Sequence, residues 1–307
     1  MHSVVRLDWD AAHVPELYQS RASGFSRCAL VDRGRGAVHT DLGACRLAAG
    51  GRMDPHVHSY EQAVYILSGT PELRVDARVY RLNPGDFAFV PVGIVHGWSN
   101  PSEQEARWLD VNTPQALAPD AGREDTFFVD DRQPLPEAIE PDMRDPRTRF
   151  VGHYEGTGPQ TLALAVKEPL RGRKAAGMDT ALLAYSGISV KMMVDKGLGA
   201  QLLTMFMVDY EPGGAAQIHD HPYEEAYFFL DGEIEAELDG KPYTLRAGDV
   251  VWAGVGSTHG FFNSGTSRVR WVETQAPQPP AQHSYRWPGQ WEYLKSRLAS
   301  GGPDASR

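Results

Sequence analysis

The chain has 307 residues, a formal net charge of −10 at pH 7 and 41% hydrophobic residues, enough apolar material for a packed core. An acidic chain repels phosphate backbones, which argues against a nucleic-acid partner. The two cysteines, Cys28 and Cys45, cannot form a disulfide framework, and no run of roughly 18 apolar residues predicts a membrane span. We therefore expect a cytoplasmic protein without a membrane partner, and the 31 Gly and 22 Pro favour an all-β fold.

The first candidate ligands lie in two segments, GGRMDPHVHSYEQAVYILSG at 50–69 and PGDFAFVPVGIVHGWSN at 84–100. His56 and His58 are two residues apart, so on a strand their side chains point to the same face. His96 would have to be brought to them by the fold, and Gln62 would complete the set.

The amide oxygen of Gln62 can coordinate a metal ion but brings no charge. This first site should therefore bind a divalent ion more weakly, or leave it more Lewis-acidic. Glu61 is one residue out of register and could serve as a ligand only if the strand bulges there.

Residues 113–147 are rich in Pro, Asp and Glu, which predicts a linker with little regular structure. After this linker the chain repeats itself, with GGAAQIHDHPYEEAYFFLDG at 213–232 and AGDVVWAGVGSTHGFFN at 247–263. Each candidate ligand of the first half has a counterpart 163 residues later (219 − 56 = 163). A single offset without internal gaps indicates a duplicated domain rather than an array of short repeats.

The second copy offers His219, His221, Glu225 and His259. Three imidazole nitrogens and one carboxylate oxygen suit Mn, Fe, Co, Ni, Cu or Zn and leave one or two coordination positions open. An open position distinguishes a catalytic metal site from a closed structural one. We expect up to two divalent transition-metal ions per chain, one for each copy.

Other side chains are expected on the ligand faces of the same strands. Strand alternation and the positions two residues after each last histidine select Tyr60, Val64, Ile66 and Trp98 in the first copy, and Tyr223, Tyr227, Phe229 and Phe261 in the second. An aromatic wall around a metal suits a small organic substrate, although ordinary core packing explains the same pattern. Tyr227 is the candidate proton donor, and Glu225 the candidate proton acceptor if it leaves the metal.

These segments resemble the two conserved motifs of the cupin superfamily. The first motif is G, five residues, HxH, three or four residues, E, six residues, G. The second is G, five residues, P, one residue, G, two residues, H, three residues, N. The first copy departs from them at Gln62, and the second at Gly254, where Pro is usual.

The resemblance implies an all-β protein of two tandem cupin barrels (double-stranded β-helix, or jelly-roll), each with the metal inside, in a monomer or homodimer. We expect the N-terminal barrel and an extension at 1–112, the linker at 113–147 and the C-terminal barrel at 148–290. A short helix and a disordered tail follow at 291–307. The helix pattern begins at 288 and places Trp291, Leu294 and Leu298 on one face.

Three function classes remain open. The preferred one is a dioxygenase-type oxidoreductase that acts on a small metabolite through the C-terminal metal, because the ligand set of that barrel resembles that of cupin dioxygenases. The second is a non-redox metal enzyme, such as an isomerase, a lyase or a hydrolase like the ureidoglycine aminohydrolases, with the metal as Lewis acid. The third is a non-catalytic protein that binds a metal or a small ligand.

Overall fold

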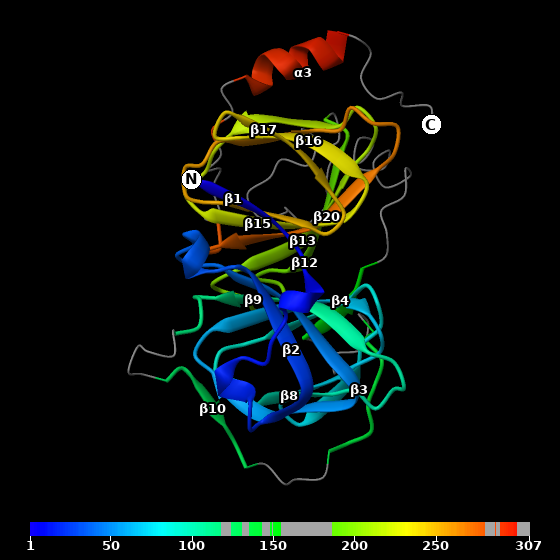
Figure 1. Ribbon diagram of the computed structural model, residues 1–307. Helices are drawn as coiled ribbons and strands as arrows, with labels where there is room; N and C mark the ends of the chain where they lie inside the picture. The colour runs from blue at the N-terminus through cyan, green and yellow to red at the C-terminus, as the bar shows by residue number, and fades with distance from the viewer. Residues whose placement is uncertain are drawn as a thin grey trace. The chain divides into compact units, whose positions relative to one another are not determined.

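The computed structural model describes residues 1–117, 124–130, 135–142, 148, 150–154, 186–279, 286 and 289–299. Their regular structure is almost entirely β, and they fall into two compact units, which confirms the expected all-β architecture with two barrels (Figure 1). No helix among these residues is long and apolar enough to cross a membrane. The tail expected at 300–307 lies outside the described residues.

The first unit is built on one ten-stranded sheet in the order β11-β7-β4-β9-β3-β8-β5-β6, with β2 and β10 also paired to β3. Its strands are β2 (Ala22–Val31), β3 (Asp41–His58), β4 (Glu61–Ser68), β5 (Glu72–Val75), β6 (Arg78–Arg81), β7 (Asp86–Val90), β8 (His96–Ser99), β9 (Ala106–Thr113), β10 (Thr126–Phe128) and β11 (Val151–His153). The long strand β3 carries both His56 and His58 at its end, where it pairs with β8 and β10.

The second unit consists of a six-stranded sheet, β1-β18-β15-β20-β13-β12, and a four-stranded sheet, β14-β19-β16-β17. Its strands are β1 (His2–Arg6), β12 (Ile188–Val194), β13 (Thr204–Tyr210), β14 (Ala215–His219), β15 (Glu224–Asp231), β16 (Glu233–Leu238), β17 (Lys241–Arg246), β18 (Asp249–Ala253), β19 (His259–Phe262) and β20 (Val269–Ala276). The faces of these strands that point inward form one continuous apolar core.

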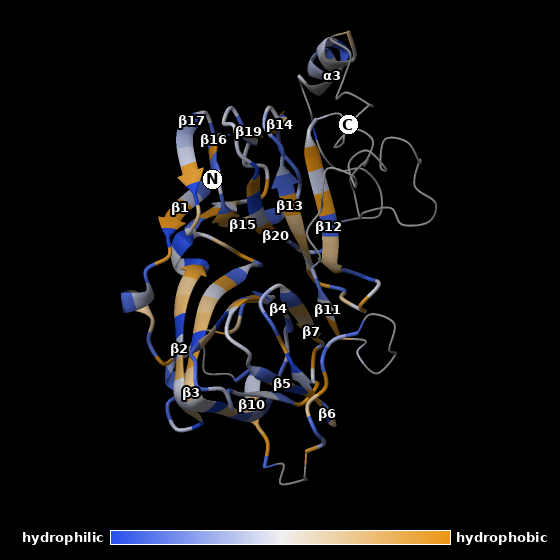
Figure 2. Cartoon of the chain, turned by 90° about the vertical axis from the view of Figure 1, so that its right-hand side faces the viewer, coloured by the Kyte–Doolittle hydropathy of each residue, from blue (hydrophilic) through white to orange (hydrophobic). Residues whose placement is uncertain are grey.

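Strand alternation explains why these residues form these elements. In β16, Ile234, Ala236 and Leu238 are buried and the three glutamates between them are exposed, as the sequence predicts. Hydrophobic and hydrophilic positions likewise interleave along the strands of both units (Figure 2). The two-residue turn at Asp239 and Gly240, both with positive φ, closes the hairpin to β17.

Two short segments group with the compact unit that the other sequence copy forms. Strand β1 pairs with β18 and extends the sheet of the C-terminal barrel (Figure 1). Residues 194–203 belong to the N-terminal unit, where the Glu61 carboxylate accepts the backbone N–H groups of Gln201 and Leu202, each at 2.8 Å.

The expected linker contributes one strand to the N-terminal barrel: β10 lies within 113–147 and pairs with the histidine end of β3. The next strand, β11, follows the expected linker and pairs with β7 of the same barrel. Backbone pairing to an open sheet edge is possible for a polar, Pro-rich segment, and it leaves little trace in hydrophobic periodicity. At the other end of the chain, α3 (Gln290–Ala299) confirms the expected helix. The side chains of Trp291, Leu294 and Leu298 are not among the described ones.

Candidate metal centre

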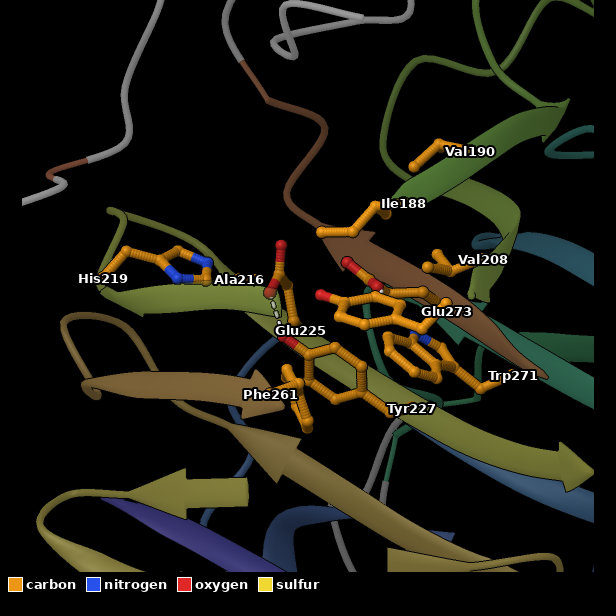
Figure 3. Close-up of a pocket in the computed structure, with 11 residues that line it drawn as sticks. Ile188, Val190, Val208, Ala216, His219, Glu225, Tyr227, Phe261, Trp271 and Glu273 are labelled. Atoms are coloured by element: carbon orange, nitrogen blue, oxygen red, sulfur yellow. Dashed lines mark hydrogen bonds between the residues drawn. The ribbon is translucent and has the colours of Figure 1, made fainter. Parts of the chain in front are cut away.

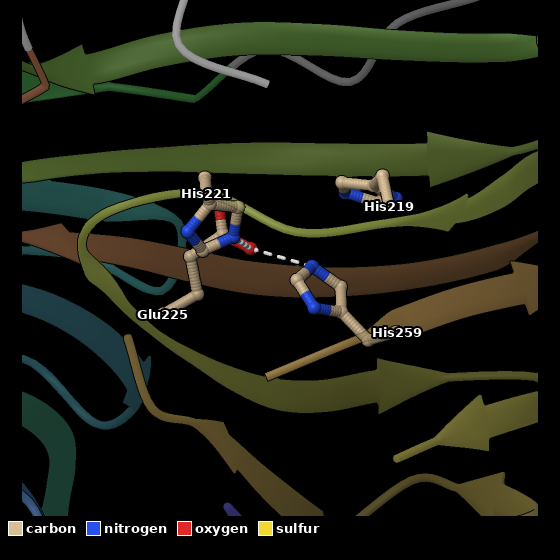
Figure 4. A group of neighbouring side chains, drawn as sticks. All are labelled: His219, His221, Glu225 and His259. Atoms are coloured by element: carbon tan, nitrogen blue, oxygen red, sulfur yellow. Dashed lines mark ion pairs between the residues drawn. The ribbon is translucent and has the colours of Figure 1, made fainter. Parts of the chain in front are cut away.

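The C-terminal barrel brings its four predicted ligands together. His219 ends β14 and pairs directly with His259, the first residue of β19, while Glu225 lies in β15. His221 lies between β14 and β15, and all four side chains are buried. One ligand atom from each of the four lies within 4.8 Å of the others, and no other described residues form such a group of His, Cys, Asp or Glu (Figure 4).

Backbone carbonyls orient the three imidazoles. The Nδ1 atoms of His219, His221 and His259 lie 2.8–2.9 Å from the carbonyl oxygens of Gln217, Tyr223 and Ser257. A carbonyl oxygen can only accept, so each Nδ1 carries a proton and Nε2 is the atom of each ring that could bind a metal. This arrangement of donors behind the ligands is the one that metal-binding histidines usually have.

The carboxylate of Glu225 is the electrostatic centre of the group. Its Oε2 lies 2.8 Å from Nε2 of His221 and 3.2 Å from Nε2 of His259 (Figure 4). The same oxygen accepts the hydroxyl of Tyr227 (Figure 3). Gln275 donates its side-chain N–H to Oε1 at 2.7 Å. Burial alone would raise the pKa of Glu225, but the contacts with His221 and His259 hold it well below its usual range.

The pKa values of two of the imidazoles shift in opposite directions. Burial lowers the pKa of His219, whereas the pKa of His221 is raised because its pairing with Glu225 outweighs the effect of burial. A metal ion binds imidazole in its neutral form, so three imidazole nitrogens and one carboxylate oxygen would form a donor set that fits a divalent transition metal. The residues present therefore fit a metal ion.

A small cavity adjoins this group on its open side. Its volume of about 30 Å³ leaves room for roughly two water-sized groups. Figure 3 shows Glu225 and Glu273 extending toward the same space, with Ile188 and Val190 beside it. The Trp271 indole N–H donates to Glu273 at 2.9 Å, while burial and the nearby Glu225 charge raise the pKa of Glu273 well above its usual value.

The N-terminal barrel repeats the imidazole arrangement. The ring centroids of His56, His58 and His96 are 6.2, 4.1 and 4.5 Å apart, against 6.1, 4.2 and 4.9 Å for the corresponding pairs in the C-terminal barrel. Nδ1 of His56 and of His96 again faces a backbone carbonyl. Burial lowers the pKa of His56 to about 4 and that of His58 to about 3, so both rings are neutral at pH 7.

The two barrels differ at the fourth candidate ligand, which is Gln62 in the N-terminal barrel and Glu225 in the C-terminal barrel. The Oε1 atom of Gln62 and the Nε2 atoms of His58 and His96 are buried without a hydrogen-bond partner. Buried polar atoms without a partner destabilise a fold, so these three atoms fit the role of cation ligands. The Gln62 amide instead donates to Asn112 at 3.0 Å.

The predicted wall residues divide into two groups. Tyr60 and Tyr223 stack face to face on His58 and His221, at ring distances of 3.9 and 4.1 Å. The others, Val64, Ile66, Trp98, Phe229 and Phe261, are part of the apolar cores. Among the predicted residues, Tyr227 has the hydroxyl placed to act on the ligand group.

Several polar residues inside the barrels were missed from the sequence. They are Arg27, Asp41, Asp110 and Asn112 in the first barrel and Thr204, Glu273 and Gln275 in the second. The single 163-residue offset could have found them, because it aligns Asp110 with Glu273 and Asn112 with Gln275 (275 − 112 = 163). They lie outside the histidine motifs, so those motifs do not point to them.

Comparison with known proteins finds a cupin domain in each half of the chain. The model of the cupin domain matches residues 43–112 and 206–274. The protein SchB of Streptomyces halstedii is 30% identical over 115 residues, which cover 37% of this chain and 83% of SchB.

Solved structures share the fold over most of the chain. Salicylate 1,2-dioxygenase from Pseudaminobacter salicylatoxidans superimposes with a TM-score of 0.61 at 14% identity, covering 81% of this chain and 76% of the enzyme. Oxalate decarboxylase from Lactobacillus farciminis gives a TM-score of 0.59 at 17% identity, covering 96% and 92%. These identities show a common fold and leave the reaction open.

Proposed function

Because this chain belongs to the cupin family and contains two cupin domains, we propose that it is a metal-dependent enzyme for a small organic metabolite. The metal would lie in the C-terminal barrel on His219, His221, Glu225 and His259. The observation that carries this proposal is the buried convergence of these four side chains beside a cavity. A dioxygenase-type oxidation is the preferred reaction.

The chain's own residues supply binding and proton transfer at this site. A divalent metal on these ligands would supply Lewis acidity and, if redox-active, electrons for dioxygen chemistry. The Tyr227 hydroxyl already donates to Glu225, so a proton can pass between them if the carboxylate turns away from the ligand group. Buried apolar residues such as Ile188 and Phe261 exclude bulk water from the cavity.

The second candidate is a non-redox isomerase, lyase or aminohydrolase-like hydrolase. It is favoured by Glu273, because a second carboxyl group in the cavity provides the acid–base partner that a Lewis-acid reaction needs. The two fold neighbours, a dioxygenase and a decarboxylase, support metal chemistry on small molecules without selecting one reaction. A non-catalytic metal or ligand carrier is the third candidate.

A metal site in the N-terminal barrel, on His56, His58, Gln62 and His96, is part of the proposal. It rests on the matching ring geometry and on the unpartnered Gln62 oxygen. A small-molecule substrate, a cytoplasmic location and a monomeric or homodimeric state complete it.

The test loads metal-free protein separately with iron, manganese, nickel, copper and zinc and then measures bound metal and oxygen uptake. Diketones, phenols and hydroxy acids form the substrate panel. We expect one to two ions per chain and uptake with at least one redox-active form. Bound metal without uptake in any form would favour the Lewis-acid candidate, and no bound metal after loading would contradict the proposal.

A further inference from the structure

The two barrels place an acid at the same interior position and give it different partners. Asp110 in β9 corresponds to Glu273 in β20 (273 − 110 = 163), and both are buried. Each follows a tryptophan of the core by two residues, Trp108 in one barrel and Trp271 in the other. The duplicated fold therefore permits a direct comparison of what each acid binds.

In the N-terminal barrel the acid binds a guanidinium of the same chain. Arg27 Nε lies 2.9 Å from both carboxylate oxygens of Asp110, and Nη2 donates to Asp41 at 2.8 Å. The guanidinium lies against Gly43, where an added Cβ would be only 2.4 Å from Cζ of Arg27. The backbone thus leaves space at Gly43 for this planar donor group.

In the C-terminal barrel the guanidinium is replaced by a much smaller side chain. Val190 of β12 takes the position of Arg27 (190 − 27 = 163), and both Val190 and Glu273 line the cavity beside the ligand group. Glu273 accepts the Trp271 indole N–H at 2.9 Å, and no guanidinium fills the cavity that it lines together with Val190. A donor group that enters this cavity would meet a buried carboxyl group that can accept a further hydrogen bond.

We propose that the cavity between Val190 and Glu273 receives a hydrogen-bond-donating group of the substrate, an N–H or O–H group. This group occupies the position of the Arg27 guanidinium in the other barrel. Glu273 is then a specificity-determining residue that anchors one end of the substrate while the other end faces His219 and Glu225. The inference rests on the proposed function and narrows its substrate class to molecules with a compact donor end.

The size of the cavity agrees with this role. About 30 Å³ accommodates a small polar group such as an amino, amide or hydroxyl group but not a whole aromatic ring. Glu273 can accept a hydrogen bond from a charged donor group, as Asp110 does from Arg27, or from a neutral one.

The experiment uses zinc-loaded full-length protein and three small probes followed by NMR titration. Guanidinium is the charged donor, acetamide the neutral donor, and tetramethylammonium a cation without a donor. We expect at least one donor probe to bind and tetramethylammonium not to bind. Val190→Arg fills the cavity from within and should weaken donor binding about tenfold or more, as loss of a buried charge-assisted site does.

Two further variants keep the result interpretable. Ser189→Arg adds the same side chain to the same strand at the neighbouring position, which alternation turns to the other face, and should leave probe binding unchanged. Glu273→Leu removes the acceptor without adding bulk and should weaken binding as Val190→Arg does, even if Val190→Arg folds poorly.

Failure of both donor probes to bind, or equal binding to wild type and both cavity variants, would overturn the inference. Zinc content is measured in every sample, so the two proposals can fail separately. Donor binding that depends on Glu273 in a protein that retains no metal would contradict only the proposed function.

Discussion

The two barrels share their imidazoles and differ in the polar residues behind them. In the N-terminal barrel, hydrogen bonds lead from Gln62 through Asn112 and Asp41 to the guanidinium of Arg27. In the C-terminal barrel the corresponding chain leads from Glu225 through Gln275 and ends at Thr204.

Duplication has thus preserved the three nitrogens in both barrels while changing the charge around them. The N-terminal barrel has the neutral Gln62 at the fourth candidate position and an ion-pair network around Arg27. The C-terminal barrel has the carboxylate of Glu225 at that position and a cavity beside it. This difference supports the proposal that the C-terminal site binds the substrate, and it suggests a stabilising role for the network of the N-terminal barrel.

The largest expected contrast is in activity. His221→Ala removes one ligand of the C-terminal site and should lower turnover about 10³-fold, or about 4 kcal/mol in activation free energy. His58→Ala makes the same change in the N-terminal barrel and should leave turnover within about tenfold of wild type, since its site is not proposed to bind substrate. Kinetics with matched metal analysis measures both, and loss of turnover in His58→Ala alone would reverse the assignment.

The next contrast is in stability. Arg27→Leu leaves the buried Asp110 and the partly buried Asp41 without their cation and should destabilise the N-terminal barrel by about 3–5 kcal/mol. Val190→Leu at the matching position of the other barrel retains an apolar residue, and we expect a change below about 1.5 kcal/mol. Urea unfolding monitored by hydrogen exchange of peptides from each barrel separates the two effects; similar losses would show that the network does not stabilise its barrel.

Acid should affect the metal-free barrels unequally. In the N-terminal barrel the folded pKa values of His56 and His58, about 4 and about 3, lie below the unfolded value of 6.5. The unfolded chain therefore binds more protons below pH 6.5, and stability falls as pH drops from 6.5 toward 4, by about 1.4 kcal/mol for each pKa unit of difference.

In the C-terminal barrel the pKa of His221 is raised, so its contribution has the opposite sign. Its pairing with Glu225 stabilises the fold below pH 6.5 and is lost as pH rises through the folded pKa of His221. His219, whose pKa is lowered, acts in the same direction as His56 and His58, but the pairing of His221 with Glu225 opposes it. Because all three histidines of the N-terminal site have lowered pKa values, we expect that barrel to open first on acidification of chelator-treated protein. Peptide-resolved hydrogen exchange at pH 7, 6 and 5 measures the order, and earlier opening of the C-terminal barrel would contradict it.

The smallest expected effect concerns the fourth ligand. Gln62→Glu gives the N-terminal site the charge that Glu225 gives the other and should strengthen divalent-metal binding about tenfold, or about 1.4 kcal/mol. In this variant the side-chain oxygen of Asn112 no longer receives the N–H of Gln62. The double variant Gln62→Glu with Asn112→Gln reproduces the Glu225–Gln275 pair of the other barrel and is therefore the better comparison. Titration with zinc measures both, and unchanged affinity would show that ligand charge does not limit this site.

Much of the fold and the ligand group could be predicted because their signals are local. HxH spacing, strand alternation and one constant offset gave both histidine sets and the Glu225 position. Strand alternation also explains Glu61, which lies one residue out of register with the candidate ligands. Its carboxylate accepts the backbone N–H groups of Gln201 and Leu202 and does not join the ligand group.

The remaining features depend on contacts between residues distant in sequence. The Arg27–Asp110 pair spans 83 residues, and neither residue lies in a recognisable motif. The pairing of β1 with β18 links two ends of the chain through backbone hydrogen bonds, which any sequence of suitable length can make. Neither contact leaves a periodic pattern that a reader of the sequence could detect.

The pairing of β1 with β18 affects the order in which the C-terminal barrel folds and the stability of fragments of the chain. The residues of β1 are synthesised well before their partner strand, so the C-terminal sheet is completed only when β18 has been made. Expressing either half alone by cutting at 113–147 would separate β18 from its neighbour and expose an unpaired edge, which favours aggregation. A stable C-terminal fragment should require the first six residues to be supplied in trans or by circular permutation.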